Sequence, residues 1–318
     1  MATHLLGASV ALHDLIRLRS ECAPWRRRAL HTGAAGGMRR TVRHGRGIEF
    51  EEVRAYQSTD DARSIDWRVT ARKGKPHTKV YREEHEQPLL LGVDLRRPMQ
   101  FGSRDRFKSV AAAELCALLA WAALEDDDRV GGAVATTHGL KLFPPRRADA
   151  AVLQLLACVA KGTQLPAAEA VPTTTLVPPP PPLALETLLS AIARDARTGH
   201  RCVIISDFHD LTASGVQRIQ QIARRRVTTC ALVFDPLEVE LPLPDRYRLR
   251  TAHGAGTAVL DAREDALRAR HRERFVQRRG MLQALARAAG VRTLELCVDS
   301  HTAALAFQRG RNLLQGPR

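Results

Sequence analysis

The sequence predicts an α/β protein with a mostly parallel sheet, helices on both faces and a small N-terminal β-rich module. Two apolar runs, residues 89–94 and 201–207, each end in an acid, which is typical of strands buried on both faces. Helical patterns separate them from further strand-like runs. Parallel neighbours need crossover connections, so this alternation indicates a parallel sheet covered by helices.

Size and composition allow two modest domains or one large domain with a smaller one attached. The chain has 318 residues, of which 44% are hydrophobic, and a formal net charge of +15. Such a charge favours an acidic partner, whether nucleic acid, anionic lipid or protein. Most basic residues are arginine and no aromatic residues are interleaved with them, so solvated surface charge is the simpler explanation.

The cysteines and the apolar segments predict a soluble, cytoplasmic protein. The six cysteines contain no C-x-x-C pair and are expected to be small core residues in a reducing compartment. Residues 1–15 lack the basic start of a secretory signal. The longest apolar run, 110–124, contains Glu114 and is shorter than the roughly 20 residues that a membrane span needs.

The N-terminal part divides into two predicted regions. Residues 1–45 hold a short amphipathic helix at 10–18 and a basic, glycine-bearing connector. Residues 46–87 form the β-rich module. Apolar and acidic residues alternate around 48–51 as in a half-buried strand, and residues 65–69 resemble another such strand. A turn at 73–76 then makes 65–82 resemble a hairpin.

Residues 88–318 are predicted to be the α/β domain with a C-terminal helix-strand-helix extension. Strands are expected at 89–94, 129–136, 140–143, 201–207, 227–234 and 291–298. The third of these is an antiparallel return after a turn. Helices are expected at 105–125, 148–160, 185–197, 214–225, 264–289 and 302–308. Proline-rich segments, 162–182 and 236–245, interrupt the pattern, and 246–261 is β-like.

Ligands of open parallel sheets bind in the crevice at the carboxyl ends of the strands. Asp94 and Asp207 end two of the predicted strands, so both should point into that crevice. Arg96, Arg97 and Ser206 stand beside them in sequence and complete the predicted binding site.

A second polar concentration lies in the β-rich module. Acids, arginines and two aromatic residues stand close together there: Glu49, Arg54, Tyr56, Asp60, Asp61, Arg63, Asp66, Trp67 and Arg72. Clustered carboxylates can hold ions that activate water, so a metal-dependent hydrolase or nuclease is one alternative. Nearby arginines, Arg68 among them, could instead pair with these acids. We therefore expect an ion-pair network, anchored by Tyr56 and Trp67, that fixes the module to the α/β domain.

This stretch resembles the motif of the domain of unknown function 58 family. The similar residues run from Arg46-Gly47 through Tyr56, Asp60 to Trp67 and Ala71-Arg72. The resemblance implies a β-rich module joined to a von Willebrand factor A-like α/β domain. It also implies a partner, since many members are described beside MoxR-type AAA+ ATPases with a proposed role in assembling or maturing other proteins.

Von Willebrand factor A-like domains often bind Mg²⁺ through D-x-S-x-S after the first strand, with a later threonine and aspartate. In this chain Asp94 keeps the first position and Asp207 matches the later aspartate, but Arg96 and Pro98 replace both serines. A guanidinium repels a divalent ion and can neutralise the acids itself. We therefore expect no cofactor and an ion-pair cluster of Arg96 with Asp94 and Asp207; Mg²⁺ on these two acids is the disfavoured alternative.

The leading functional hypothesis is a non-enzymatic interaction or scaffold module that works with a MoxR-type ATPase. Ser206, Asp207 and His209 are too close in sequence to converge on one atom, and no G-x-S-x-G elbow is present. The alternatives are hydrolysis by Asp60, Asp61 and Asp66, or nucleic-acid binding through arginines. Those arginines lie at 26–46 and in the predicted helix at 264–279, as Arg268, Arg270, Arg272, Arg274, Arg278 and Arg279.

Overall fold

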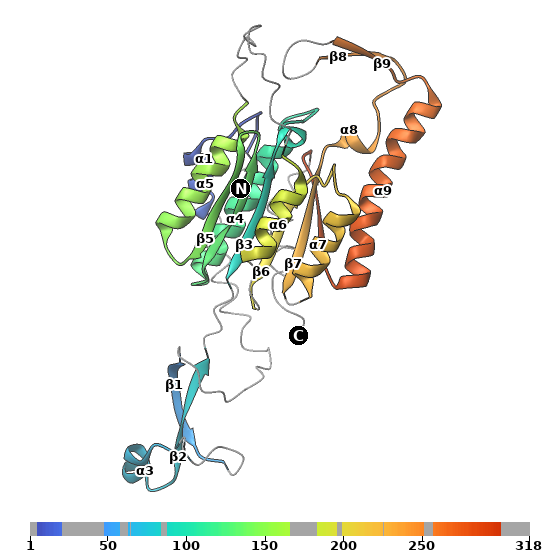
Figure 1. Ribbon diagram of the computed structural model, residues 1–318. Coiled ribbons are helices and arrows are strands. Elements are labelled where there is room, and N and C mark those ends of the chain that lie inside the picture. The colour runs from blue at the N-terminus through green and yellow to red at the C-terminus, as the bar shows by residue number, and fades with distance from the viewer. Residues whose placement is uncertain are drawn as a thin grey trace. The chain divides into compact units, whose positions relative to one another are not determined.

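The computed structural model divides the chain into two compact units (Figure 1). Residues Thr32–Glu86 form the smaller unit, and Met1–His31 with Gln87–Arg318 form the larger one. The structure describes residues 5–20, 48–57, 63, 65–83, 88–165, 183–195, 199–224, 226–250 and 257–299.

The larger unit is built on a six-stranded sheet in the order β10-β7-β6-β3-β4-β5. Every neighbouring pair is parallel except the edge strand β5, which runs antiparallel to β4. The strands are β3 (Leu89–Leu95), β4 (Val130–Thr136), β5 (Gly139–Arg146), β6 (Arg201–Ser206), β7 (Val227–Phe234) and β10 (Arg292–Cys297). The prediction of a mostly parallel sheet with one antiparallel return is confirmed.

Helices cover both faces of this sheet, as the alternation of segments predicted. One face packs against α1 (Leu12–Arg17), α4 (Lys108–Glu125) and α5 (Asp149–Thr163). The other packs against α6 (Leu185–Asp195), α7 (Ala213–Ala223) and α9 (Asp265–Ala289). Alternate residues of β3 divide between the two cores: Leu91 joins the first, and Leu90 the second.

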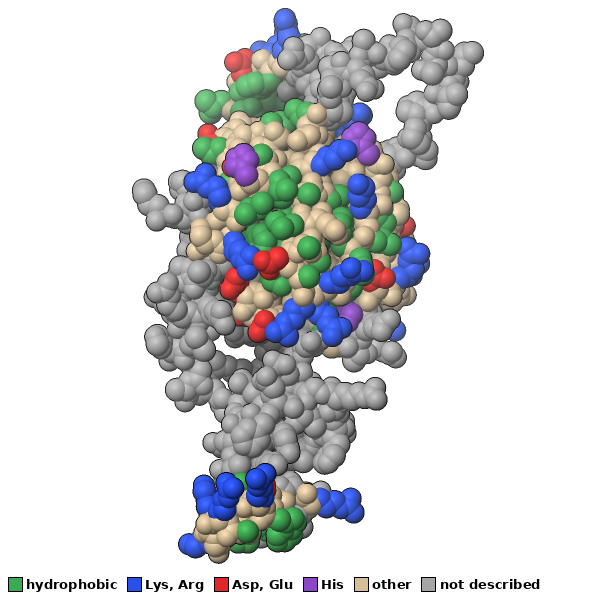
Figure 2. Space-filling view, turned by 90° about the vertical axis from the view of Figure 1, so that its left-hand side faces the viewer, with side chains coloured by type: hydrophobic (Ala, Val, Ile, Leu, Met, Phe, Trp, Pro, Cys, Tyr) green, Lys and Arg blue, Asp and Glu red, His purple; other side chains and the backbone are tan. Residues whose placement is uncertain are grey.

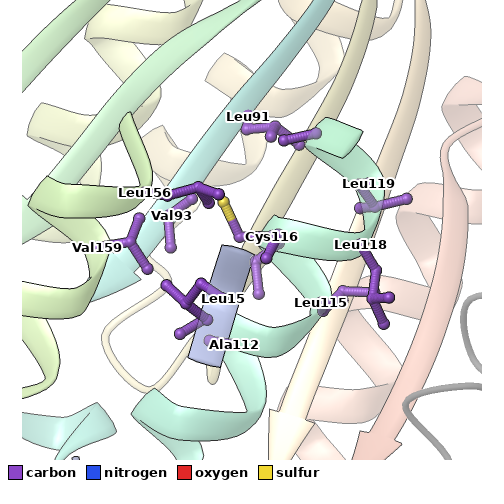
Figure 3. Packing of buried hydrophobic residues seen from close by; sticks show 14 of the residues in the cluster. Leu15, Leu91, Val93, Ala112, Leu115, Cys116, Leu118, Leu119, Leu156 and Val159 are labelled. Atoms are coloured by element: carbon purple, nitrogen blue, oxygen red, sulfur yellow. The ribbon is translucent and has the colours of Figure 1, made fainter. Parts of the chain in front are cut away.

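Helix α4 lies at the centre of the first core and is buried on nearly all sides. Figure 3 shows its apolar residues meeting side chains of α1, α5 and β3, among them Leu15, Leu156 and Val93. The indole Nε1 of Trp121 donates to the backbone oxygen of Leu15 over 2.9 Å, which ties α1 to α4. The N-terminal helix therefore belongs to the core of the larger unit.

Three short elements of the described chain, α8, β8 and β9, lie between β7 and α9. A one-turn helix, α8 (Pro236–Val239), stands where the sequence suggested only a proline-broken segment. The stretch 246–261, which the sequence predicted to be β-like, contains an antiparallel pair of strands, β8 (Arg246–Arg250) and β9 (Thr257–Asp261). The helix expected at 302–308 lies outside the described residues. No helix in the described part of the chain combines the length and apolarity needed to cross a bilayer.

The smaller unit differs from the predicted hairpin at 65–82. Strand β1 (Ile48–Ala55) pairs antiparallel with β2 (His77–Glu83), and a helix, α3 (Trp67–Lys73), connects them. Of the strand expected at 65–69, only a single bridge between Ile65 and Thr78 remains.

Local capping explains why a helix forms where alternation suggested a strand. The Asp66 carboxylate accepts hydrogen bonds from the backbone N–H groups of Arg68 and Val69, at 2.9 and 3.2 Å, and so caps the N-terminus of α3. Gly74 ends the helix with φ of 67°, a left-handed conformation that favours glycine. Asp66 is thus the helix cap of α3.

Replacing Asp66 with Ala should loosen α3 by about 1 kcal/mol, because two helix N–H groups lose their acceptor. Hydrogen exchange of the Arg68 and Val69 amides should quicken correspondingly. Asp66→Ser, which can still cap, should restore most of the protection. Unchanged exchange in Asp66→Ala would contradict the capping role.

Candidate functional site

The candidate site lies at the carboxyl ends of β3 and β6, the two central neighbours of the sheet. The chain leaves β3 toward β4 on one side, and β6 later enters on the other side, so the strand order reverses between them. Ligands of open α/β sheets bind at such switch points. Val93 is in register with Ile205, which brings Asp94 beside Ser206.

Asp94 is fully buried and held by a bidentate pair with Arg96. The guanidinium donates from Nε to Oδ1 over 2.9 Å and from Nη2 to Oδ2 over 2.8 Å. The backbone N–H of Arg96 donates to Oδ1, and the Ser206 hydroxyl donates to Oδ2 over 2.7 Å. Both carboxylate oxygens are therefore occupied, and the expected pairing of Arg96 with Asp94 is confirmed.

The second acid on Arg96 is Asp210, so the expected pairing of Arg96 with Asp207 is wrong. Nη1 and Nη2 of Arg96 donate to the two Asp210 oxygens over 2.7 and 2.8 Å. Nη1 also donates to the backbone oxygen of Leu183, and the Leu185 N–H donates to Asp210 over 3.1 Å. Arg96 thus links the end of β3 to the start of α6 and to the turn before α7.

These contacts shift the ionisation of both partners. Burial lowers the pKa of Arg96, but hydrogen bonds to Asp210 and Asp94 raise it by more, so it lies above its ordinary value. Burial raises the pKa of Asp210, but hydrogen bonds from Arg96 and from the Leu185 N–H lower it by more, so it lies below its ordinary value. Both groups are charged at neutral pH.

Asp207 has a different cation, Lys108, which the sequence analysis did not select. Lys108 Nζ lies 2.7 Å from Asp207 Oδ2 and 3.0 Å from Glu238 Oε1, and its side chain is 2% exposed. The N–H of His209 donates to the other Asp207 oxygen over 3.0 Å. The signal in the sequence is a lysine at the first position of a mostly apolar, buried helix, where a charge requires a partner.

Arg278 of α9 extends the same cluster. Its Nη1 donates to the backbone oxygen of Asp207 over 3.0 Å and lies 3.4 Å from Glu238 Oε1. Glu238 therefore stands between Lys108 and Arg278, which joins α4, α8 and α9 at the end of β6.

Asp235 is a further buried acid that the sequence analysis missed. Its carboxylate accepts from the Ser103 hydroxyl over 2.5 Å, from the Ser103 N–H and from the Leu237 N–H. The Asp235 N–H in turn donates to Glu238 over 3.1 Å, which completes a capping box on α8. The sequence Asp235-Pro236-x-Glu238 carries this signal, since proline favours the first helical position.

Magnesium does not fit the strand-end acids. The oxygens of Asp94 are engaged by Arg96 and Ser206, and those of Asp207 by Lys108 and the His209 N–H. A cation would have to displace a buried guanidinium or ammonium group, and the position of one lost serine is filled by Arg96 itself. Within the described residues, no cluster of three or more His, Cys, Asp or Glu side chains is arranged to hold a metal ion.

Exposed residues, called the crevice rim below, stand next in sequence to the buried residues of the strand ends. Arg97 and His209 are exposed, while Asp94, Ser206 and Asp207 are fully buried. The residues at the strand ends therefore separate into two groups. Asp94, Arg96, Ser206 and Asp207 belong to a buried set of paired charges, called the closed charge network below, and Arg97 and His209 are at the surface.

The residues expected to form the network of the smaller unit are only partly described. Asp60 and Asp61 lie outside the described residues, as do the side chains of Glu49 and Arg54. Tyr56 is half-buried, and Arg63 and Arg72 are exposed. Trp67 is 71% exposed.

The arginines of α9 are largely used within the chain. Arg268 donates to the backbone oxygens of Leu241 and Pro242. Arg272 pairs with Glu240, and Arg279 with Glu295. Arg270 and Arg274 are exposed. On the face of the larger unit in Figure 2, basic side chains are scattered around a hydrophobic centre, without the continuous basic stripe that nucleic-acid binding favours.

Three of the described cysteines, Cys116, Cys202 and Cys230, are core residues as expected, whereas Cys158 and Cys297 are only partly buried. Cys202 and Cys230 are fully buried in strands, and burial raises the pKa of each thiol to about 12. At neutral pH these thiols are protonated, so they are poor nucleophiles and poor metal ligands.

Replacing Arg96 with Met should destabilise the larger unit by about 3–5 kcal/mol, because Asp94 would stay buried without its cation. The neighbouring change Arg97→Met removes the same charge from an exposed site and should alter stability by less than about 0.5 kcal/mol. Urea unfolding of both variants measures the difference. Equal losses would show that Arg96 is not the required partner of Asp94.

The contribution of Asp210 should depend on pH. Because its pKa is depressed in the folded state, its stabilising effect is present above the unfolded-state value of about 3.9 and is lost as the pH falls through the folded-state pKa. Asp210→Asn should therefore melt at a lower temperature than the wild type at pH 7, and the gap should shrink toward pH 3. A gap that is constant between these pH values would contradict the assignment.

Comparison with known proteins supports the family resemblance that the motif in the smaller unit suggested. Residues 52–280 match the family model described as "Protein of unknown function DUF58". Uncharacterized proteins of Mycobacterium bovis and Mycobacterium tuberculosis are 29% identical over 198 residues, or 62% of this chain and 58% of theirs. The chain thus aligns with little more than half of these relatives' length. No solved structure matches it. On the family match, the chain belongs to the DUF58 family of proteins of unknown function.

Proposed function

We propose that this chain is a non-enzymatic interaction or scaffold module that docks another protein at the switch-point crevice. The observation that carries the proposal is the closed charge network. Asp94 and Asp207, the acids best placed for chemistry, are each fully buried and each paired with a cation of the same chain. Acids paired in this way are poor general bases and poor metal ligands, so a surface for recognition fits the crevice better than a reaction centre.

The architecture supports a von Willebrand factor A-like assignment for the larger unit. Its strand order, with a parallel centre and one antiparallel edge strand, suits that fold, as does an aspartate at the end of the first strand of the sheet. In this assignment the crevice corresponds to the Mg²⁺ site of such domains, in a degenerate form that has lost both serines of D-x-S-x-S. Arg96 takes the place of the metal by binding Asp94 and Asp210 at once.

The partner we propose is a MoxR-type AAA+ ATPase, which the family resemblance suggests. A rigid floor with an exposed rim suits docking, because few side chains need ordering when the partner binds. Arg97 and His209 provide the accessible contacts on this rim. In this role the module would help the ATPase to assemble or mature other proteins.

Binding of a purified MoxR-type ATPase from the same organism tests this function. The charge reversal Arg97→Glu should weaken binding by about tenfold or more, because a rim contact becomes repulsive. Arg274→Glu makes the same charge change on the exposed face of α9 and should bind like the wild type. The proposal fails if the wild-type chain captures no ATPase, or if both variants bind equally.

A further inference from the structure

A surface groove between α6 and α7 has no role in the closed network or in the crevice. Its volume is about 640 Å³. The lining residues come from both helices and from the start of β7: Thr187, Ser190, Ala193, Arg194, Arg218, Gln221, Ile222 and Arg226. Arg226 directly precedes β7, and Arg194 stands near the end of α6, so this groove extends toward the amino ends of the strands.

The lining is basic and carries hydrogen-bond donors. Three guanidinium groups, those of Arg194, Arg218 and Arg226, contribute to it, and no Asp or Glu is among the described residues that line it. Thr187, Ser190 and Gln221 add two hydroxyls and an amide. Ala193 is partly exposed and adds a small apolar surface, whereas Ile222 is fully buried. The groove therefore offers mainly positive charge and hydrogen-bond donors.

No described acid lines the groove, but Glu186 at the start of α6 interacts with one of its arginines. Hydrogen bonds from the hydroxyls of Ser214 and Thr212 lower the pKa of the Glu186 carboxyl, and the charge of Arg218 lowers it further. Asp195 follows Arg194 in α6 but does not line the groove. Arg218 makes a long contact of 3.4 Å to Gln221, which leaves most of its donors for a ligand.

We propose that the α6–α7 groove binds an acidic segment of a partner protein. Arginine forks bind carboxylates in a bidentate manner, and the hydroxyls and amide of the lining can add hydrogen bonds to such a segment. Single-stranded nucleic acid is the less suitable ligand, because none of the lining residues is an aromatic side chain on which bases could stack. This surface is separate from the crevice, so the proposal does not depend on the function proposed above.

Fluorescence anisotropy with the full-length chain tests the groove. The probe is a labelled glutamate-rich peptide of roughly ten residues, which spans about 15 Å if helical. A peptide with glutamine in place of glutamate and a single-stranded DNA of matched length serve as comparison probes. The double variant Arg194→Glu/Arg218→Glu alters the groove. Arg270→Glu/Arg274→Glu makes the same change in net charge on exposed positions of α9.

The wild type should bind the acidic peptide and not the glutamine peptide. The groove variant should bind the acidic peptide at least about tenfold more weakly than the wild type, and the α9 variant should lose less than about threefold in affinity for this peptide. If the groove variant unfolds, Arg194→Gln/Arg218→Gln provides the same comparison. The proposal is overturned if the acidic peptide does not bind or if both variants lose affinity for it equally. It is also overturned if the single-stranded DNA binds more tightly than the acidic peptide and the groove variant loses affinity for both.

Discussion

The structure of the larger unit depends on neutralising two buried acids at the centre of its sheet. Asp94 and Asp207 are fully buried at the ends of β3 and β6. A buried charge without a partner costs several kcal/mol, so each acid requires a cation at close range. Arg96 and Lys108 meet this requirement, and their other contacts determine which surrounding elements are held together.

The two cations connect the layers of the fold. Arg96 reaches the start of α6 and the turn before α7 through Leu183 and Asp210. Lys108, at the start of α4, reaches Glu238 of α8, which also contacts Arg278 of α9. The contacts of Lys108 therefore join α4 on one face of the sheet to α9 on the other, and those of Arg96 join β3 to α6. The charged residues at the strand ends are thus held by several elements of the fold at once.

The two surfaces that we propose for partners lie at opposite ends of the strands. The crevice rim presents Arg97 and His209 at the carboxyl ends of the strands. The α6–α7 groove presents arginines toward the amino ends. Most of the positive charge on α9 is engaged by backbone oxygens and acids of the same chain. The high net charge of the sequence therefore does not by itself identify a nucleic-acid surface.

The sequence by itself determined the mostly parallel sheet, the helices on both faces and the place of Asp94 and Asp207, because apolar periodicity and strand-end position are local properties. It also indicated that Arg96 would neutralise Asp94, two residues away. Only the tertiary structure decided that Asp210 is the second acid on Arg96 and that Lys108 serves Asp207, since those contacts join residues 114 and 99 positions apart. The α3 helix was misjudged for a different reason: alternation at 65–69 suggested a strand, while the Asp66 cap and the left-handed Gly74 favour a helix.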